Sequence, residues 1–155
     1  MKVKWIFYAV PIFIGAILLF YLTHHTDLST ENINNLTLDV LYFPVDNLNH
    51  SVDPYSDGSV NYTYEDGLQV RVNQGNEVIR IWVQSPGENY KTEKNIIIGD
   101  RVSKIMEQYG DHDYLRSEQG STIYGYIDRK LNYRLEFWTN DDIIYTIRFD
   151  QKRLD

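Results

Sequence analysis

The stretch from Val60 to Val83, VNYTYEDGLQVRVNQGNEVIRIWV, decides the fold class. Its apolar residues fall at every second position in three successive runs. Asp66-Gly67 supplies a turn between the first two runs, and Asn73-Gln74-Gly75-Asn76 supplies a turn between the last two. Because side chains of a strand alternate between two faces, the pattern predicts a three-stranded antiparallel meander. The residues predicted to share the inward face of the last strand are Ile79, Ile81 and Val83.

A second alternating unit lies near the C-terminus. Residues 123–127 are a strand candidate, and residues 131–137 alternate before an Asn140-Asp141-Asp142 turn. The residues predicted to face inward from the final strand are Ile143, Tyr145, Ile147 and Phe149. This hairpin follows the earlier one by about 66 residues and is similar to it. Two related β-meander halves, about 37–86 and 87–155, are one explanation, and two generic hairpins are the other.

A short helix is predicted between the two units, at about residues 100–109. Asp100 is placed to cap its N-terminus, and Gly110 stands at the C′ position. Four apolar residues recur at the i, i+3, i+4 and i+7 spacing of one helix face: Val102, Ile105, Met106 and Tyr109. The predicted fold class is therefore α+β, a mainly antiparallel β domain with one short helix.

The residues before the first meander are more polar. Residues 23–36 are rich in Ser, Thr and Asn and are expected to form a spacer. Residues 37–48 are apolar enough for a strand, and Pro44 restricts that strand to an edge of the sheet. Residues 46–59 have the composition of a loop. The folded domain is thus expected to span residues 37–155.

The N-terminal segment has the pattern of a membrane anchor. Residues 5–22, WIFYAVPIFIGAILLFYL, carry no charge and would span about 27 Å as a helix, close to the thickness of a bilayer core. Lys2 and Lys4 precede this run, and basic residues favour the cytoplasmic side. We therefore expect a cytoplasmic tip at residues 1–4, a transmembrane anchor at residues 5–22 and a single-pass cell-membrane protein whose C-terminal domain lies outside.

A cleaved signal peptide is the alternative for this segment. Its apolar run is longer than the usual 7 to 15 residues, and no small-x-small cleavage site follows it. An uncleaved anchor is the preferred prediction. Both alternatives place the remainder of the chain outside the cytoplasm.

Composition excludes several classes of function. The 155-residue chain has no cysteine, so it contains neither a disulfide framework nor a thiol nucleophile. Its formal charge is −7, and every acidic residue follows the apolar run. Because nucleic-acid affinity depends on clustered Lys and Arg, DNA and RNA are poor candidates as partners.

From Ile96 to Phe149 the order of elements resembles a known group of domains. The segment IIIGDRVSKIMEQYG is followed, after a polar stretch, by YRLEFWTNDDIIYTIRF. This arrangement is similar to the small-domain superfamily of the β-lactamase-inhibitor protein and the outer-membrane assembly lipoproteins of the SmpA/OmlA type. The matching positions are Gly99, Asp100, Ile105, Gly110, Ile144 and Ile147. The resemblance implies a domain that binds other proteins and has no enzyme activity. The chain departs from it in lacking a lipidated cysteine.

No catalytic, cofactor or metal constellation stands out in the sequence. Residues 53–58 partly match a calcium loop, but Tyr55 and Tyr64 occupy two positions that need oxygen ligands from carboxylates or amides. Asp111-His112-Asp113, followed by Arg116 and Glu118, places acids beside a histidine in an expected exposed loop, where nothing predicts a shared pocket. We therefore expect no enzyme activity, no cofactor and no small-molecule substrate.

The candidate binding surface lies on the sheet face that the helix is expected to leave uncovered. Its members are Arg80, Trp82, Trp138 and Arg148. Aromatic residues and arginine concentrate at the centres of protein interfaces. Alternatively, residues 37–48 cover this face. The preferred function is a membrane-anchored interaction module for a protein or cell-envelope component. The alternative is an inhibitor of a cell-envelope hydrolase, with residues 46–59 as a protruding loop.

Overall fold

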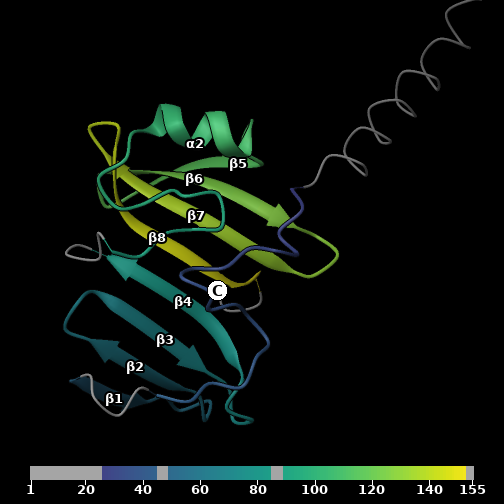
Figure 1. Cartoon of the computed structure of the whole chain (residues 1–155), viewed down its shortest axis with the longest axis vertical. Helices are drawn as coiled ribbons and strands as arrows, with labels where there is room; N and C mark the ends of the chain where they lie inside the picture. Colours follow the sequence, from purple (N-terminus) through teal and green to yellow (C-terminus); the bar gives the residue numbers. More distant parts are fainter. Residues whose placement is uncertain (1–25, 45–48, 85–88, 153–155) are drawn as a thin grey trace, which may run out of the picture.

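In the part of the chain that the computed structural model describes, the predicted alternation of apolar residues builds one antiparallel sheet of eight strands, accompanied by one helix (Figure 1). The structure describes residues 26–44, 49–84 and 89–152. The strands follow the spatial order β1-β2-β3-β4-β8-β7-β6-β5. Their bounds are β1 His50–Pro54, β2 Val60–Tyr64, β3 Leu68–Val72, β4 Val78–Gln84, β5 Tyr114–Glu118, β6 Ser121–Asp128, β7 Tyr133–Asn140 and β8 Ile143–Gln151.

The helix α2, Val102–Tyr109, is confirmed, although its predicted N-cap is not. Arg101 occupies the N-cap position and makes no capping bond through its side chain. The carboxylate of Asp100 instead accepts bonds from the Ile97 backbone N–H at 2.9 Å and from Lys104 Nζ at 2.7 Å. Gly110 ends the helix as predicted, with a φ of 75° that favours glycine.

Both predicted hairpins are present, but a β-bulge changes the phase of each. Arg71 pairs with Arg80 and Val72 with Val78, which leaves Ile79 as an extra residue. Tyr145 is likewise extra, between the Trp138–Thr146 and Thr139–Ile144 pairs. One inserted residue reverses the side chains beyond it. For this reason Val78 and Ile144 join the main core cluster, whereas the predicted Ile79, Ile143 and Tyr145 do not.

Two edge strands lie where the sequence predicts loops. β1 pairs with β2 within the segment expected to protrude, so residues 50–54 belong to the sheet. β5 pairs with β6 directly after the loop that follows α2. Both strands are mostly polar or exposed, because an edge strand needs little apolar surface of its own.

Residues 26–44 pack against the sheet and form neither a free spacer nor an edge strand. Leu28, Ile33 and Leu38 are buried in the core cluster. Tyr109 of α2 donates a hydrogen bond to Glu31 at 2.7 Å, and burial raises the pKa of that carboxyl. Residues 37–44 thus lie on the helix side of the sheet and do not cover the opposite face, which the alternative prediction assigned to residues 37–48. Residues 45–48 lie outside the described residues.

The two four-stranded meanders, β1–β4 and β5–β8, meet at a junction with two-fold symmetric pairing. Trp82 pairs with Arg148 at its centre, and Arg148 lies 66 positions after Trp82. Ile81 pairs with Phe149, and Val83 pairs with Ile147. Ile147 lies 66 positions after Ile81, and Phe149 lies 66 positions after Val83, so exchanging the two halves turns each pair into the other. The Ile79 and Tyr145 bulges also differ by 66 positions. The contact therefore has the form of an isologous interface, in which equivalent residues exchange places.

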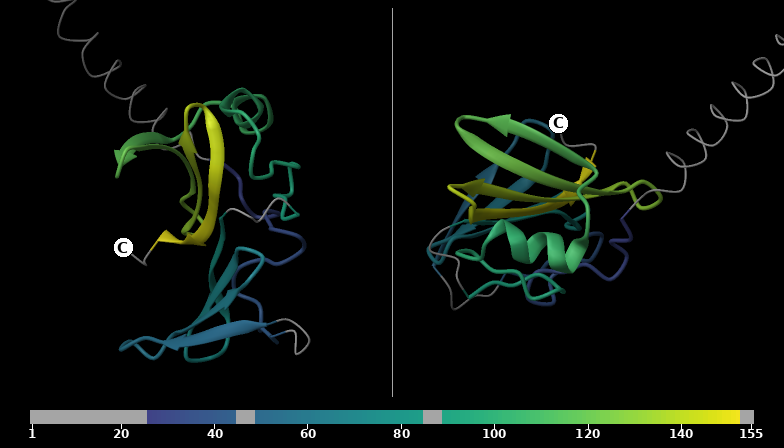
Figure 2. Two further views of the ribbon diagram at one scale, coloured as in Figure 1. Left: turned by 90° about the vertical axis from the view of Figure 1, so that its left-hand side faces the viewer. Right: turned by 90° about the horizontal axis from the view of Figure 1, so that it is seen from above.

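The two faces of the sheet differ in shape and in composition. α2 and residues 89–101 lie on the convex side, above the apolar core (Figure 2). On the other side the sheet is concave, because β5 and β6 curve round toward β7 and β8 (Figure 2). We call the hollow on this side, where side chains of β5, β7 and β8 line a pocket, the trough. We refer to this side as the concave face.

Within the described residues, no helix is long and apolar enough to cross a membrane. The predicted tip, residues 1–4, and anchor, residues 5–22, lie outside the described residues.

Candidate functional site

Polar and aromatic side chains line the concave face in rows that cross the strands. Directly opposed residues in an antiparallel sheet point to the same side, so the pairing register defines each row. The central row runs through all eight strands as Ser51, Thr63, Gln69, Trp82, Arg148, Glu136, Gly125 and Tyr114. The row beside it contains Arg71, Arg80, Asp150 and Arg134.

Asp150 of β8 is one of two fully buried carboxylates on this face. Arg134 approaches it with two nitrogens, at 3.0 and 3.1 Å. Arg148 contributes Nε at 2.6 Å, and Arg80 contributes Nε at 3.1 Å. Three guanidinium groups therefore surround one carboxylate, and their planar forks fix its orientation.

Glu136 of β7 is the second fully buried carboxylate. It accepts hydrogen bonds from the Tyr114 hydroxyl, from Arg116 Nη2 at 3.1 Å and from Trp138 Nε1 at 3.1 Å. Burial alone would raise its pKa. The hydrogen bond of Tyr114, the charges of Arg134 and Arg148 and the bond from Trp138 outweigh burial and hold the pKa of Glu136 below its usual value. Glu136 is thus ionised at neutral pH.

Gly125 of β6 makes the approach of Tyr114 possible. The two residues are paired across β5 and β6, and the Tyr114 ring lies over Gly125 to reach Glu136 on the next strand. A Cβ at position 125 would lie 2.0 Å from Tyr114 Cζ. Only glycine leaves space for this ring, so one residue type decides whether β5 can close over the trough.

The four residues of the predicted binding surface come together at the junction of the two meanders. The rings of Trp82 and Trp138 lie 6.0 Å apart, and Arg148 lies 5.8 Å from the Trp82 ring centre. Arg80 joins them through Asp150. However, Trp138 is only 8% exposed and Arg148 only 7% exposed. These residues therefore form the floor of the trough, whereas the sequence predicts an open patch.

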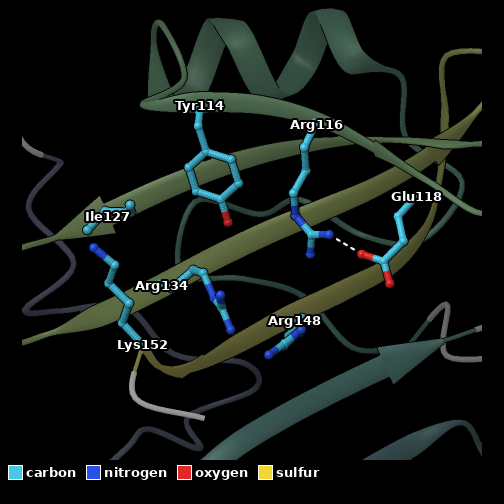
Figure 3. Close-up of a pocket in the computed structure, with 7 residues that line it drawn as sticks. All are labelled: Tyr114, Arg116, Glu118, Ile127, Arg134, Arg148 and Lys152. Atoms are coloured by element: carbon cyan, nitrogen blue, oxygen red, sulfur yellow. Dashed lines mark hydrogen bonds and ion pairs between the residues drawn. The ribbon is translucent and has the colours of Figure 1, made fainter. Parts of the chain in front are cut away.

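A pocket of about 520 Å³ opens above this floor (Figure 3). It is lined by Tyr114, Arg116, Glu118, Ile127, Arg134, Arg148 and Lys152. Arg116 and Glu118 of β5 form its lip and pair with each other, with side chains 35% and 42% exposed. Figure 3 shows the side chains of Arg116, Arg134 and Arg148 converging on the space between β5 and β8.

The charge of this site is opposite in sign to that of the chain. Five cationic side chains gather in the pocket and its floor: Arg80, Arg116, Arg134, Arg148 and Lys152. Three carboxylates, Glu118, Glu136 and Asp150, oppose them. The site thus has two more positive than negative charges, within a chain of formal charge −7. Such a site favours an anionic group.

The sequence did not identify Glu136, Asp150, Arg134 or Tyr114 as members of the site. Arg116 and Glu118 were predicted to lie in an exposed loop, whereas they line the pocket from β5. A signal was available in YRLEFW and in IRFD, where ionisable residues occupy alternate positions of otherwise apolar strands. Alternation alone indicates an exposed face. Tyr114 and Arg116, which contact Glu136, come from β5, and the sequence did not predict that strand.

The other candidates of the sequence serve local structure. Asp113 accepts hydrogen bonds from the Ile127 N–H at 2.8 Å and from the Thr26 hydroxyl at 3.0 Å, while His112 packs edge-on against Tyr124. Asp57 binds Ser59 and Arg71. Within residues 26–44, 49–84 and 89–152, no three His, Cys, Asp or Glu side chains are grouped as metal ligands.

Two solved structures show a distant likeness to this fold. The first is an extracellular protein containing a SCP domain from Bacillus anthracis str. Ames, with a TM-score of 0.44 and 13% identity over 65% of this chain. The second is a DUF4309 family protein (YjgB) from Bacillus subtilis subsp. subtilis str. 168, with a TM-score of 0.37 and 11% identity over 70% of this chain. The matches span 38% and 68% of those chains. No protein-family model and no curated protein sequence matches the chain.

Proposed function

We propose that this chain is a membrane-anchored binding module, without enzyme activity, that holds a protein partner against the concave face of its sheet outside the cytoplasm. The observation that carries the proposal is the cationic pocket in an acidic chain. The pocket lies on a buried floor in which arginines and carboxylates are paired with one another.

The membrane placement is supported by the sequence of the first residues. An uncharged run at residues 5–22 follows Lys2 and Lys4, as in helices that leave their N-terminus in the cytoplasm. The resemblance to the small-domain superfamily of the β-lactamase-inhibitor protein and SmpA/OmlA-type lipoproteins supports a role in protein binding.

The chemistry of the pocket favours binding over catalysis. A general base needs a pKa near the working pH, whereas the pKa of Glu136 is held low by its partners. Asp150 is held by three arginines in the floor of the pocket. A network of this kind is suited to keeping its geometry while a partner docks.

Site-specific photo-crosslinking in the native membrane tests this function. A photoreactive residue in place of Lys152 lies at the pocket, and one in place of Glu107 lies on the exposed side of α2 as the matched control. We expect one discrete protein adduct from position 152 and none from position 107. Equal adducts from both positions, or no adduct from position 152, would contradict the proposal.

A further inference from the structure

We propose that the pocket between β5 and β8 recognises a carboxylate of the protein partner, presented by an acidic side chain, and that Glu118 of this chain competes with it. The inference rests on the proposed function and specifies the group that the partner must supply.

Arg116 is the cation best placed to meet an incoming carboxylate. It contacts the buried Glu136 through Nη2 at 3.1 Å and the half-exposed Glu118 through Nη1. Its side chain stays 35% exposed, and its guanidinium lies 5.4 Å from the centre of the Trp138 ring. Glu136 and the indole hold the guanidinium in place, so a ligand would not have to order a flexible side chain.

Glu118 shows that the pocket accommodates a carboxylate. It lines the cavity from an edge strand and is 42% exposed. An ion pair that is this accessible to water contributes little to stability, because solvent screens the two charges. A partner carboxylate that also gains contacts with the deeper cations can therefore displace Glu118 from Arg116 at little cost.

The dimensions of the pocket and the charge of the chain favour an acidic side chain over a nucleic acid. A cavity of about 520 Å³ can accept one or two side chains. An extended polyanion would have to pass the acidic remainder of a chain of charge −7. The guanidinium groups of Arg116, Arg134 and Arg148 are planar forks that match a carboxylate in a bidentate geometry.

The test uses the full chain, labelled with ¹⁵N, in uncharged detergent micelles. N-acetyl-glutamate amide is titrated against it, with N-acetyl-glutamine amide as the neutral isostere and inorganic phosphate as a third probe. The chain has three indole N–H groups, from Trp5, Trp82 and Trp138. We expect the glutamate probe to shift the signals of Trp82 and Trp138, to leave that of Trp5 unchanged, and to bind at least threefold more tightly than either of the other probes.

Variants separate the pocket from general charge effects. Glu118→Gln removes the competitor and is expected to tighten binding of the glutamate probe at least threefold. Lys152→Gln removes a lining cation and is expected to weaken binding by a similar factor. Glu107→Gln, on α2, is the matched control and should leave the affinity unchanged, because it changes the same net charge as Glu118→Gln on the other face of the sheet.

Equal shifts with the glutamine probe, tighter binding of phosphate, the absence of any indole shift or unchanged affinity in Glu118→Gln would each overturn the inference. Crosslinking from position 152 without carboxylate binding would reject carboxylate recognition and would leave the proposed function unaffected. Carboxylate binding without any crosslinked protein would reject the function instead.

Discussion

The meanders β1–β4 and β5–β8 share a strand pattern and a bulge position, yet only the second builds a charged trough. The difference lies in one row of cross-strand residues. The first meander contributes Ser51, Thr63 and Gln69, whereas the equivalent positions of the second are Tyr114, Gly125 and Glu136. The second meander therefore has an aromatic ring, a glycine and a carboxylate where the first has three uncharged polar side chains. The two meanders differ at these three positions and also in their outer strands. β1 is mostly exposed, whereas β5 lies over the buried carboxylate of Glu136.

The largest effect is expected from removing the buried charge. Glu136→Gln removes one of the two buried carboxylates that neutralise Arg134 and Arg148, and breaking a buried ion pair in this way costs about 3–5 kcal/mol. At the equivalent position of the first meander, Gln69→Ala should change the stability by no more than about 1 kcal/mol, because that amide is only partly buried. Urea unfolding of the full chain in micelles, followed by tryptophan fluorescence, measures both. Equal losses would show that the two meanders depend on this row to the same extent.

An exchange between the glycine and the threonine of this row is expected to have an intermediate effect. Gly125→Thr places a Cβ against the Tyr114 ring and separates its hydroxyl from Glu136, at a cost of about 2–3 kcal/mol. The reciprocal Thr63→Gly should cost about 0.5–1 kcal/mol, the usual penalty for glycine in a strand. The same unfolding assay compares them. If Gly125→Thr were as mild as Thr63→Gly, close packing of Tyr114 over Gly125 would not hold β5 in place.

The smallest effect is expected from mild acid. The folded-state pKa of Glu136 lies below its ordinary value of 4.5, so its ionisation stabilises the fold fully above that value. This contribution is lost as the pH falls from there through the depressed folded pKa. The difference in unfolding free energy between wild type and Glu136→Gln should therefore stay nearly constant from pH 7 to 5 and shrink at lower pH. A difference that grows on acidification would mean that burial outweighs the arginines and raises the pKa of the Glu136 carboxyl.

The central strands and the helix were accessible from sequence because their patterns are local. Leu68, Val70 and Val72 alternate between two turn signals, and all three are buried as that alternation predicts. The bulges at Ile79 and Tyr145 were not predictable, because an extra residue shows itself only when the partner strand is known. β1 and β5 also escaped prediction, since their hydrogen bonds come from neighbours and their side chains carry no apolar period.

The candidate site was predicted only in part, for a related reason. Trp82 and Trp138 stood out as aromatic residues out of phase with the core, and the structure places them 6.0 Å apart. Arg80 and Arg148 were named with them, but Arg134, Glu136 and Asp150 were not, because alternation on a strand alone indicates an exposed face. Their burial follows from curvature of the sheet and from one tyrosine that passes over a glycine. Both are properties of the assembled strands and not of any short segment.

The symmetric junction between β4 and β8 has a consequence for how such a chain can vary. Because the β4–β8 pairing is unchanged when the two halves exchange places, this junction (the seam) requires the same strand geometry from each half. Substitutions in the outer strands of one half leave the seam untouched, so one half can keep a supporting role while the other acquires new chemistry. The protein thereby separates the part of its architecture that must stay fixed from the part that is open to specialisation.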